Sequence, residues 1–167
     1  MANIKGLSPS ALARTVASLD KFPPAIKARL VTFGFTRRVR FAGTASVTFE
    51  TLAEGRAVLH LANRKKVQNH IGGIHAAAMA LLAETATGAV LGMTLPDTHI
   101  PLLKSMHVDY VKRATGDLRA EATLTPEMIK RVTSEVKGDF VVPVKVTDSA
   151  GIEPIVCQFT WAWVPKK

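Results

Sequence analysis

Cysteine is almost absent from this 167-residue sequence, in which Cys157 is the single thiol. One cysteine excludes a disulfide within the chain, and sparse cysteine is typical of proteins that fold in a reducing compartment. We therefore expect a cytoplasmic protein in which Cys157 is a buried strand residue.

Long apolar runs are also absent. The longest, at 76–83 and 89–91, fall well short of the roughly 20 residues that a membrane-spanning helix needs. The first 20 residues have no hydrophobic segment after their charged residues, so no signal peptide is expected. The chain is nevertheless long enough for one domain with a substantial core.

Acidic residues are scarce, because 13 Asp and Glu oppose 22 Lys and Arg and leave a formal charge of +9. A basic surface suits nucleic acid, an anionic membrane or a polyanionic small molecule such as coenzyme A. Aromatic residues make up only 6% of the chain and no nucleic-acid motif is present, so we expect neither a nucleic acid nor a membrane partner. The basic residues form three clusters: Arg37, Arg38 and Arg40; Arg64, Lys65 and Lys66; Lys112 and Arg113.

The most informative segment is 69–88, NHIGGIHAAAMALLAETATG. A polar, glycine-containing stretch leads directly into an Ala/Leu-rich helix that carries one acidic residue, Glu84. A carboxylate among apolar neighbours is costly to bury unless it is paired or used. The start of the helix offers free backbone N–H groups and the positive end of the helix dipole to an anionic or carbonyl group.

The spacing along this helix predicts an oligomer. Nine residues separate His75 from Glu84, which is about 13 Å along the axis and about half a turn out of phase. Glu84 therefore does not reach the helix start of its own chain. A second copy packed antiparallel would bring the two together, so a shared site requires at least a two-fold dimer.

The apolar periodicity and turn residues predict an α+β fold, with an antiparallel sheet wrapped around one long helix at about 72–92. Residues 1–35 are expected to form an N-terminal helical extension, with helices to about residue 20 and at 24–33, and residues 36–167 the main domain. Strands are expected at about 36–42, 44–52, 56–63, 102–113, 117–125, 130–147 and 152–164.

This pattern resembles the hotdog fold, and the central segment is similar to the phenylacetyl-CoA-type thioesterases. That branch commonly carries Asn-x5-His-Gly-Gly-x6-Asp. The matching positions here are Asn69, His75, Ala76, Ala77 and Glu84, with every spacing kept. The stretch HVDYVKRATGDLRAEATL also resembles the strand pair that follows the helix in that family. The resemblance covers about residues 36–164, and the His-Ala-Ala and Glu variants indicate a little-characterised side branch.

The resemblance implies a hydrolase that cleaves an acyl-CoA thioester, as a homodimer or a dimer of dimers, with no cofactor and no metal. It implies that Glu84 is the general base or nucleophile and that the Ala76 N–H polarises the thioester carbonyl. Asn69 would hold the water or the substrate, and His75 would hold the loop by a hydrogen bond. The expected substrate-binding residues are Gly73, Ala77, Arg64, Lys65, Lys66, Met79 and Lys104, of which the three at 64–66 would contact the phosphates of coenzyme A.

Two features leave alternatives open. The family often has a hydroxyl residue seven positions before the strand aromatic, where this chain has Leu103, so a binding module without turnover is one alternative. Lys104 beside it could pair with an acyl-chain carboxylate or with Glu84. The other alternative is a hotdog dehydratase, in which His70 and Glu84 would remove water from a 3-hydroxyacyl thioester. His70 and His75 are five residues apart, which does not favour a metal site on one helical face.

Overall fold

The computed structural model describes residues 9–166. Its helices are α1 (Ala11–Ser18), α2 (Pro24–Arg38), α3 (Arg40–Ala45), the short 3-10 helix η1 (Lys65–Val67), α4 (Ala76–Thr94) and α5 (Pro126–Ser134). Its strands are β1 (Thr48–Ala53), β2 (Arg56–Leu61), β3 (His99–Tyr110), β4 (Leu118–Thr123), β5 (Gly138–Val142), β6 (Val144–Asp148) and β7 (Ile155–Pro165).

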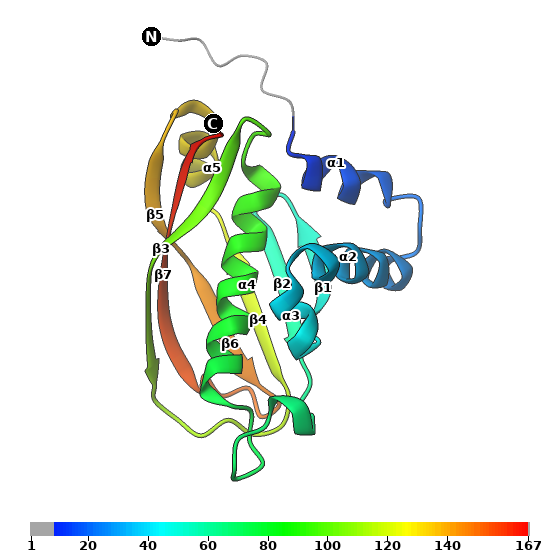
Figure 1. The fold of residues 1–167 in the computed structure, drawn as a ribbon, viewed down its shortest axis with the longest axis vertical. Helices are drawn as coiled ribbons and strands as arrows, with labels where there is room; N and C mark the ends of the chain where they lie inside the picture. Colours follow the sequence, from blue (N-terminus) through cyan, green and yellow to red (C-terminus); the bar gives the residue numbers. More distant parts are fainter. Residues whose placement is uncertain (1–8, 167) are drawn as a thin grey trace.

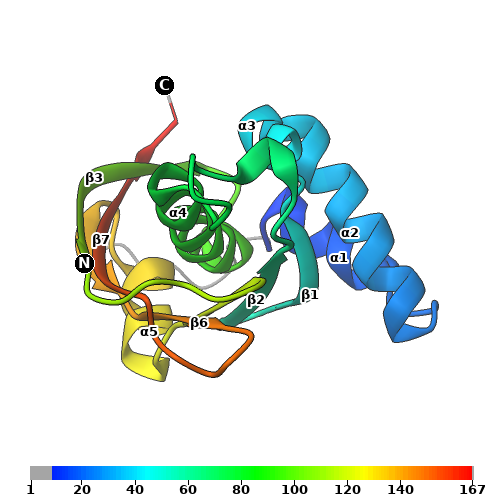
Figure 2. The same cartoon turned by 90° about the horizontal axis from the view of Figure 1, so that it is seen from below.

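The strands form two antiparallel sheets, in the orders β1-β2-β4-β6 and β3-β7-β5. The sheets curve around α4, and α1 to α3 lie together on the side where β1 forms the edge (Figures 1 and 2). The α+β prediction, with one long helix enclosed by antiparallel strands, is confirmed.

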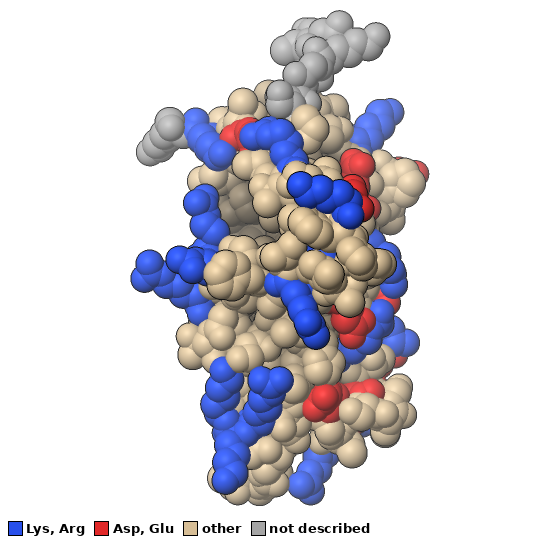
Figure 3. All heavy atoms as spheres, turned by 90° about the vertical axis from the view of Figure 1, so that its right-hand side faces the viewer, with Lys and Arg blue, Asp and Glu red and all other residues tan. Residues whose placement is uncertain are grey.

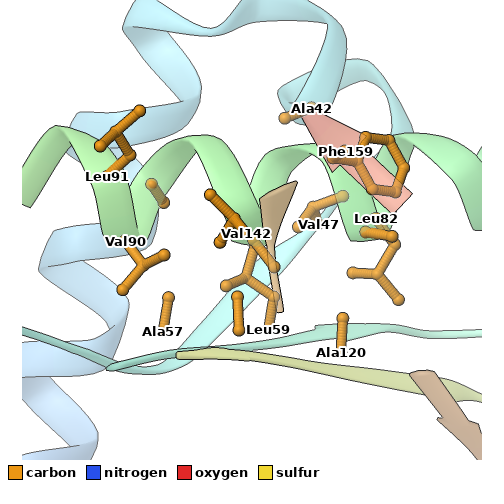
Figure 4. Close-up of a cluster of buried hydrophobic side chains, with 14 of the residues drawn as sticks. Ala42, Val47, Ala57, Leu59, Leu82, Val90, Leu91, Ala120, Val142 and Phe159 are labelled. Atoms are coloured by element: carbon orange, nitrogen blue, oxygen red, sulfur yellow. The ribbon is translucent and has the colours of Figure 1, made fainter. Parts of the chain in front are cut away.

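The central helix α4 begins at the N-cap His75 and ends at Leu95, whose extended backbone precedes Pro96. Leu82 and Val90 point toward the strands that carry Leu59 and Ala120, and Leu91 lies on the other side of the helix (Figure 4). All of these residues belong to one hydrophobic core. By length and hydropathy α4 is the one helix among residues 9–166 that could cross a membrane, but 67% of it is buried inside the molecule, as in a core helix.

A close contact fixes the rotation of α4 against the smaller sheet. The Trp161 indole N–H donates to the Thr87 hydroxyl at 2.9 Å, and that hydroxyl donates to the Ala83 and Glu84 carbonyls. The ring then lies over Gly88, where an added Cβ would be 2.8 Å from two ring carbons. Only a residue without a side chain fits under the indole.

Two of the strand predictions, at 36–42 and 130–147, are wrong, at least in part. Residues 36–42 are helical, because α2 continues to Arg38 and α3 follows, with Phe35 packed edge-on against Phe49 of β1. The alternating basic and apolar residues imitate a strand, although Arg37 and Arg38 suit the negative end of a helix dipole.

The region 130–147 begins as helix α5 and then forms β5 and β6. The residues at the start of α5 are typical of a helix N-terminus, because Thr125 caps the helix by accepting from the Met128 N–H and Pro126 occupies its first turn. The division at residue 36 falls inside α2 and stays a prediction.

We expect Gly88→Ala to destabilise the protein and Gly34→Ala to stabilise it. Both glycines lie inside helices, where alanine alone gains about 0.5–1 kcal/mol. At Gly88 the methyl group meets Trp161, and overpacking of this kind costs about 1–3 kcal/mol, whereas nothing lies within 4 Å of the same position at Gly34. Urea unfolding gives both free energies, and equal gains in the two variants would contradict the Trp161 contact.

Candidate active site

The start of α4 leaves one backbone donor free. The His75 Nδ1 accepts from the Ala77 N–H at 3.1 Å, and the His75 carbonyl accepts from the N–H groups of Ala78 and Met79. No hydrogen bond within residues 9–166 uses the Ala76 N–H. A single N–H group at the positive end of a 19-residue helix is therefore available to an external oxygen.

The loop before the helix is closed by Asn69. Its Oδ1 accepts from the N–H groups of Ile71 at 3.0 Å and Gly73 at 3.2 Å, and its own N–H donates to the Gly73 carbonyl at 2.8 Å. The Nδ2 group of Asn69 has no hydrogen bond in the described part of the chain. The side chain thus shapes the loop with its oxygen and keeps its amide donors for another partner.

A polar network that the sequence did not reveal supports this loop from the larger sheet. Asp117 accepts from the Asn63 N–H at 2.8 Å and lies 3.1 Å from His60 Nε2. Asn63 in turn donates to the Gly72 carbonyl and accepts from Gln68. The backbone bond from Asn63, with the nearby imidazole of His60, lowers the pKa of Asp117. The one sequence signal was the Thr115-Gly116-Asp117 turn.

The smaller sheet also fixes the helix start. Tyr110, the last residue of β3, donates its hydroxyl to the Ala76 carbonyl at 2.9 Å. This residue lies in the stretch that resembles the family's strand pair. The residue with the free N–H is therefore held through its carbonyl by a strand far away in the sequence.

A pocket of about 200 Å³ opens beside the helix start. Its walls come from three elements: α4 contributes His75, Ala77, Ala78 and Leu81, α3 contributes Phe41, Thr44 and Ala45, and η1 contributes Lys66 and Val67 with the adjacent Gln68. Met79 lies instead in the hydrophobic core, with 8% of its surface exposed, and does not line this pocket. The apolar lining that α4 supplies comes from Ala77, Ala78 and Leu81 instead.

Glu84 lies half-buried on the same side of α4 as Ala77, because seven residues return the helix to within about 20°. It has no ion pair within residues 9–166, and one neighbour, the Thr85 hydroxyl, donates to it at 3.4 Å. Burial raises its pKa. Eight residues, about 12 Å of helix, separate it from Ala76.

Lys104 does not pair with Glu84. It occupies the bulge of β3 between Leu103 and Ser105, and its Nζ lies 2.5 Å from an Asp139 carboxylate oxygen. The structure brings the free Ala76 N–H, Asn69, Gly73, His75 and Ala77 together with the pocket. It leaves Glu84 and Lys104 apart from them.

The basic cluster of Arg64, Lys65 and Lys66 is exposed at η1, next to the pocket. Lys66 donates to the Ser46 hydroxyl and also lines the pocket. His70 is exposed in the loop and makes no described hydrogen bond. Within the described residues, no group of three or more His, Cys, Asp or Glu could hold a metal ion.

Comparison with known proteins shows the family and the fold. Residues 27–164 match DUF4442, a domain of unknown function, and the chain belongs to this family. No curated protein matches the sequence. A protein of unknown function from Pseudomonas aeruginosa, described as a probable thioesterase, aligns with a TM-score of 0.73 and 24% identity over 86% of this chain and 97% of that one.

Two further structures support the same fold. A putative thioesterase from Shewanella oneidensis aligns with a TM-score of 0.71 and 8% identity, over 83% of this chain and 97% of its own. A thioesterase from Staphylococcus aureus aligns with a TM-score of 0.63 and 20% identity, over 75% and 99%. The predicted hotdog fold is confirmed.

We expect Glu84→Gln to stabilise the protein increasingly as the pH rises. The pKa of Glu84 is higher in the folded chain than its ordinary value of 4.5. Its contribution to the free energy of unfolding is therefore complete below pH 4.5 and is lost as the pH rises through the folded pKa. Glutamine has the same size and never ionises. The difference in unfolding free energy between variant and wild type should be larger at pH 8 than at pH 4.

The control is Glu54→Gln, which replaces an exposed glutamate in the turn between β1 and β2. Its difference from wild type should stay nearly constant between the two pH values. A constant difference for Glu84→Gln as well would show that burial of this carboxylate does not perturb its ionisation.

Proposed function

We propose that this protein hydrolyses acyl-CoA thioesters at a site shared by two copies of the chain. The observation that supports this most strongly is the free Ala76 N–H at the start of α4, beside an apolar pocket. A donor held in place before the substrate arrives stabilises the oxyanion that forms when a thioester carbonyl is attacked. The fold, shared with proteins named as thioesterases, supports the same reaction class.

The second copy supplies the missing carboxylate. β3 is an edge strand of its sheet and is exposed along most of its twelve residues, with large apolar side chains at Leu102, Met106 and Tyr110. Pairing of two such edges around a two-fold axis removes this exposed surface and sets the α4 helices antiparallel. Glu84 of one copy then faces the helix start of the other.

The chemistry follows from these groups. The thioester carbonyl oxygen accepts from the Ala76 N–H while Glu84 of the second copy takes a proton from water. The water oxygen attacks the carbonyl carbon, the C–S bond breaks, and Glu84 returns the proton to the leaving thiolate, which gives a carboxylic acid and a thiol. Because burial raises the pKa of Glu84, it is a stronger base than an exposed carboxylate. Asn69 Nδ2 orients the water.

The proposed binding residues form two groups, each suited to a different part of the substrate. The pocket beside Ala77 and Leu81 is mostly apolar and suits the acyl or pantetheine chain. Arg64, Lys65 and Lys66 are exposed at its edge and suit the phosphates of coenzyme A. This electrostatic contact weakens as the salt concentration rises.

A spacing in one relative supports the pairing of Asn69 with Glu84. Structures of the Staphylococcus aureus protein exist for alanine substitutions of a glutamine and of a glutamate fifteen positions apart. Asn69 and Glu84 are also fifteen positions apart, and asparagine carries the same amide as glutamine.

Ala76→Pro tests the oxyanion donor directly. Proline is favoured at the first position of a helix and removes only the N–H, and His75 already has the extended backbone that a residue before proline needs. We expect kcat for acyl-CoA hydrolysis to fall about 100- to 1,000-fold. Ala76→Ser keeps the N–H and should remain active, and equal activity of the two variants would contradict the role.

Mixed dimers test whether the site is shared. Glu84→Gln and Ala76→Pro should each be nearly inactive, but a dimer of one chain of each has one intact site out of two. Random mixing makes half the dimers mixed, so refolding the two together should restore about a quarter of the wild-type activity. No recovery in the mixed sample would mean that each site lies within one chain. A separate result, acyl-CoA binding without hydrolysis by the wild-type protein, would indicate a binding module.

A further inference from the structure

A second hollow lies on the far side of the molecule from β3, between α1 and α2. Its volume is about 430 Å³, within the range of small-molecule sites. We call it the α1–α2 cleft, lined by residues such as Leu12, Val16 and Leu19 on one side and Leu30, Phe35 and Arg38 on the other. Figure 3, the view onto this side, shows a hollow in the surface with Lys and Arg side chains around it.

The two walls of the cleft are held apart by different partners. The Ala11 N–H and Arg14 bind the Asp97 carboxylate at 2.5 and 2.6 Å, and Leu12 lies against Gly92 of α4. On the other side, the Thr32 hydroxyl accepts from the Phe49 N–H at 2.8 Å, so α2 is attached to β1. Each helix is thus anchored to a different element, and the cleft is present without a ligand.

Gly34 is the residue that keeps the cleft open. It lies in the interior of α2, where glycine costs about 0.5–1 kcal/mol relative to alanine. Neither of the usual reasons for glycine applies, because its φ is negative and no atom of residues 9–166 lies within 4 Å of the position that a Cβ would occupy. What the missing side chain provides is the open space itself.

Among the described residues, the lining has one charged side chain. Arg38 lies at the end of the cleft near the C-terminus of α2, and it makes no ion pair with any of residues 9–166. The remaining lining is uncharged and mostly apolar. From Leu30 to Val39 the wall extends about 13 Å along the helix. An elongated apolar ligand with one negative end fits this distribution.

We propose that the α1–α2 cleft binds a free fatty-acid anion of medium chain length. The alkyl chain lies between Leu12, Val16 and Leu30, and the carboxylate pairs with the Arg38 guanidinium. The proposal does not rest on the proposed hydrolysis, since it needs neither Ala76 nor Glu84.

Methyl NMR titration with decanoate, below its micelle-forming concentration, tests this and locates the site. We expect saturable shifts of the Leu12, Val16 and Leu30 methyl groups. Gly34→Leu fills the space and should weaken this binding at least tenfold, while the better helix-forming residue leaves the unfolding temperature unchanged or higher. Decyltrimethylammonium, which has a similar tail and the opposite charge, should not saturate the cleft.

Matched arginine variants separate specific pairing from general charge. Arg38→Gln should weaken decanoate binding about tenfold, equivalent to about 1.4 kcal/mol. Arg37→Gln removes the neighbouring charge, which lies over the Phe33 ring outside the cleft, and should leave binding unchanged. The proposal is overturned if the cleft methyl groups do not saturate, if Gly34→Leu binds as wild type does, or if the two arginine variants weaken binding equally.

Discussion

The hydrogen bonding at the start of α4 is the constraint on which the candidate site depends. A helix begins with N–H groups that have no partner within the helix, and here the neighbouring residue His75 accepts from those of Ala77, Ala78 and Met79 with its ring nitrogen and its carbonyl. The Ala76 N–H remains, and its direction is fixed because it shares a peptide plane with the His75 carbonyl, which accepts from the N–H groups of Ala78 and Met79. A change of the Ala76 side chain leaves this donor in place, which explains how the chain can depart from the common glycine pair of the resembled motif.

The rise of an α-helix imposes the second constraint. Ala76 and Glu84 belong to one rigid helix and stay about 12 Å apart whatever the rest of the chain does. Two features of the fold would allow a site to form between two copies. β3 is an edge strand with exposed apolar side chains. The face of α4 that carries Ala77, Leu81 and Glu84 is only partly covered. A single chain therefore carries both groups of the proposed site but does not bring them together.

The sequence was sufficient for features that depend on local chemistry. The long helix, its polar start, the turns at Gly55 and Gly116 and the α+β architecture follow from patterns within a few residues of each other. The failures involve long-range packing. Residues 36–42 have a strand-like pattern, but α2 gains more by continuing so that Phe35 meets Phe49, and the His60–Asp117–Asn63 network exists only because β2 pairs with β4. For Lys104 the sequence allows a pair with an acyl-chain carboxylate or with Glu84, whereas in the structure Lys104 lies at the bulge of β3 and pairs with Asp139.

The N-terminal helices give this hotdog chain its concave surfaces. α3 forms one wall of the pocket beside Ala77, and α1 and α2 form the cleft around Gly34. Each surface lies next to a residue that lowers stability. Glu84 is half-buried on α4 with no counter-ion among residues 9–166, and Gly34 occupies the interior of α2. Such costs are typical of positions retained for binding or catalysis, because a chain selected for stability alone would replace either residue with ease. Two unrelated kinds of local cost, one electrostatic and one conformational, thus lie next to two of the hollows that the N-terminal helices line.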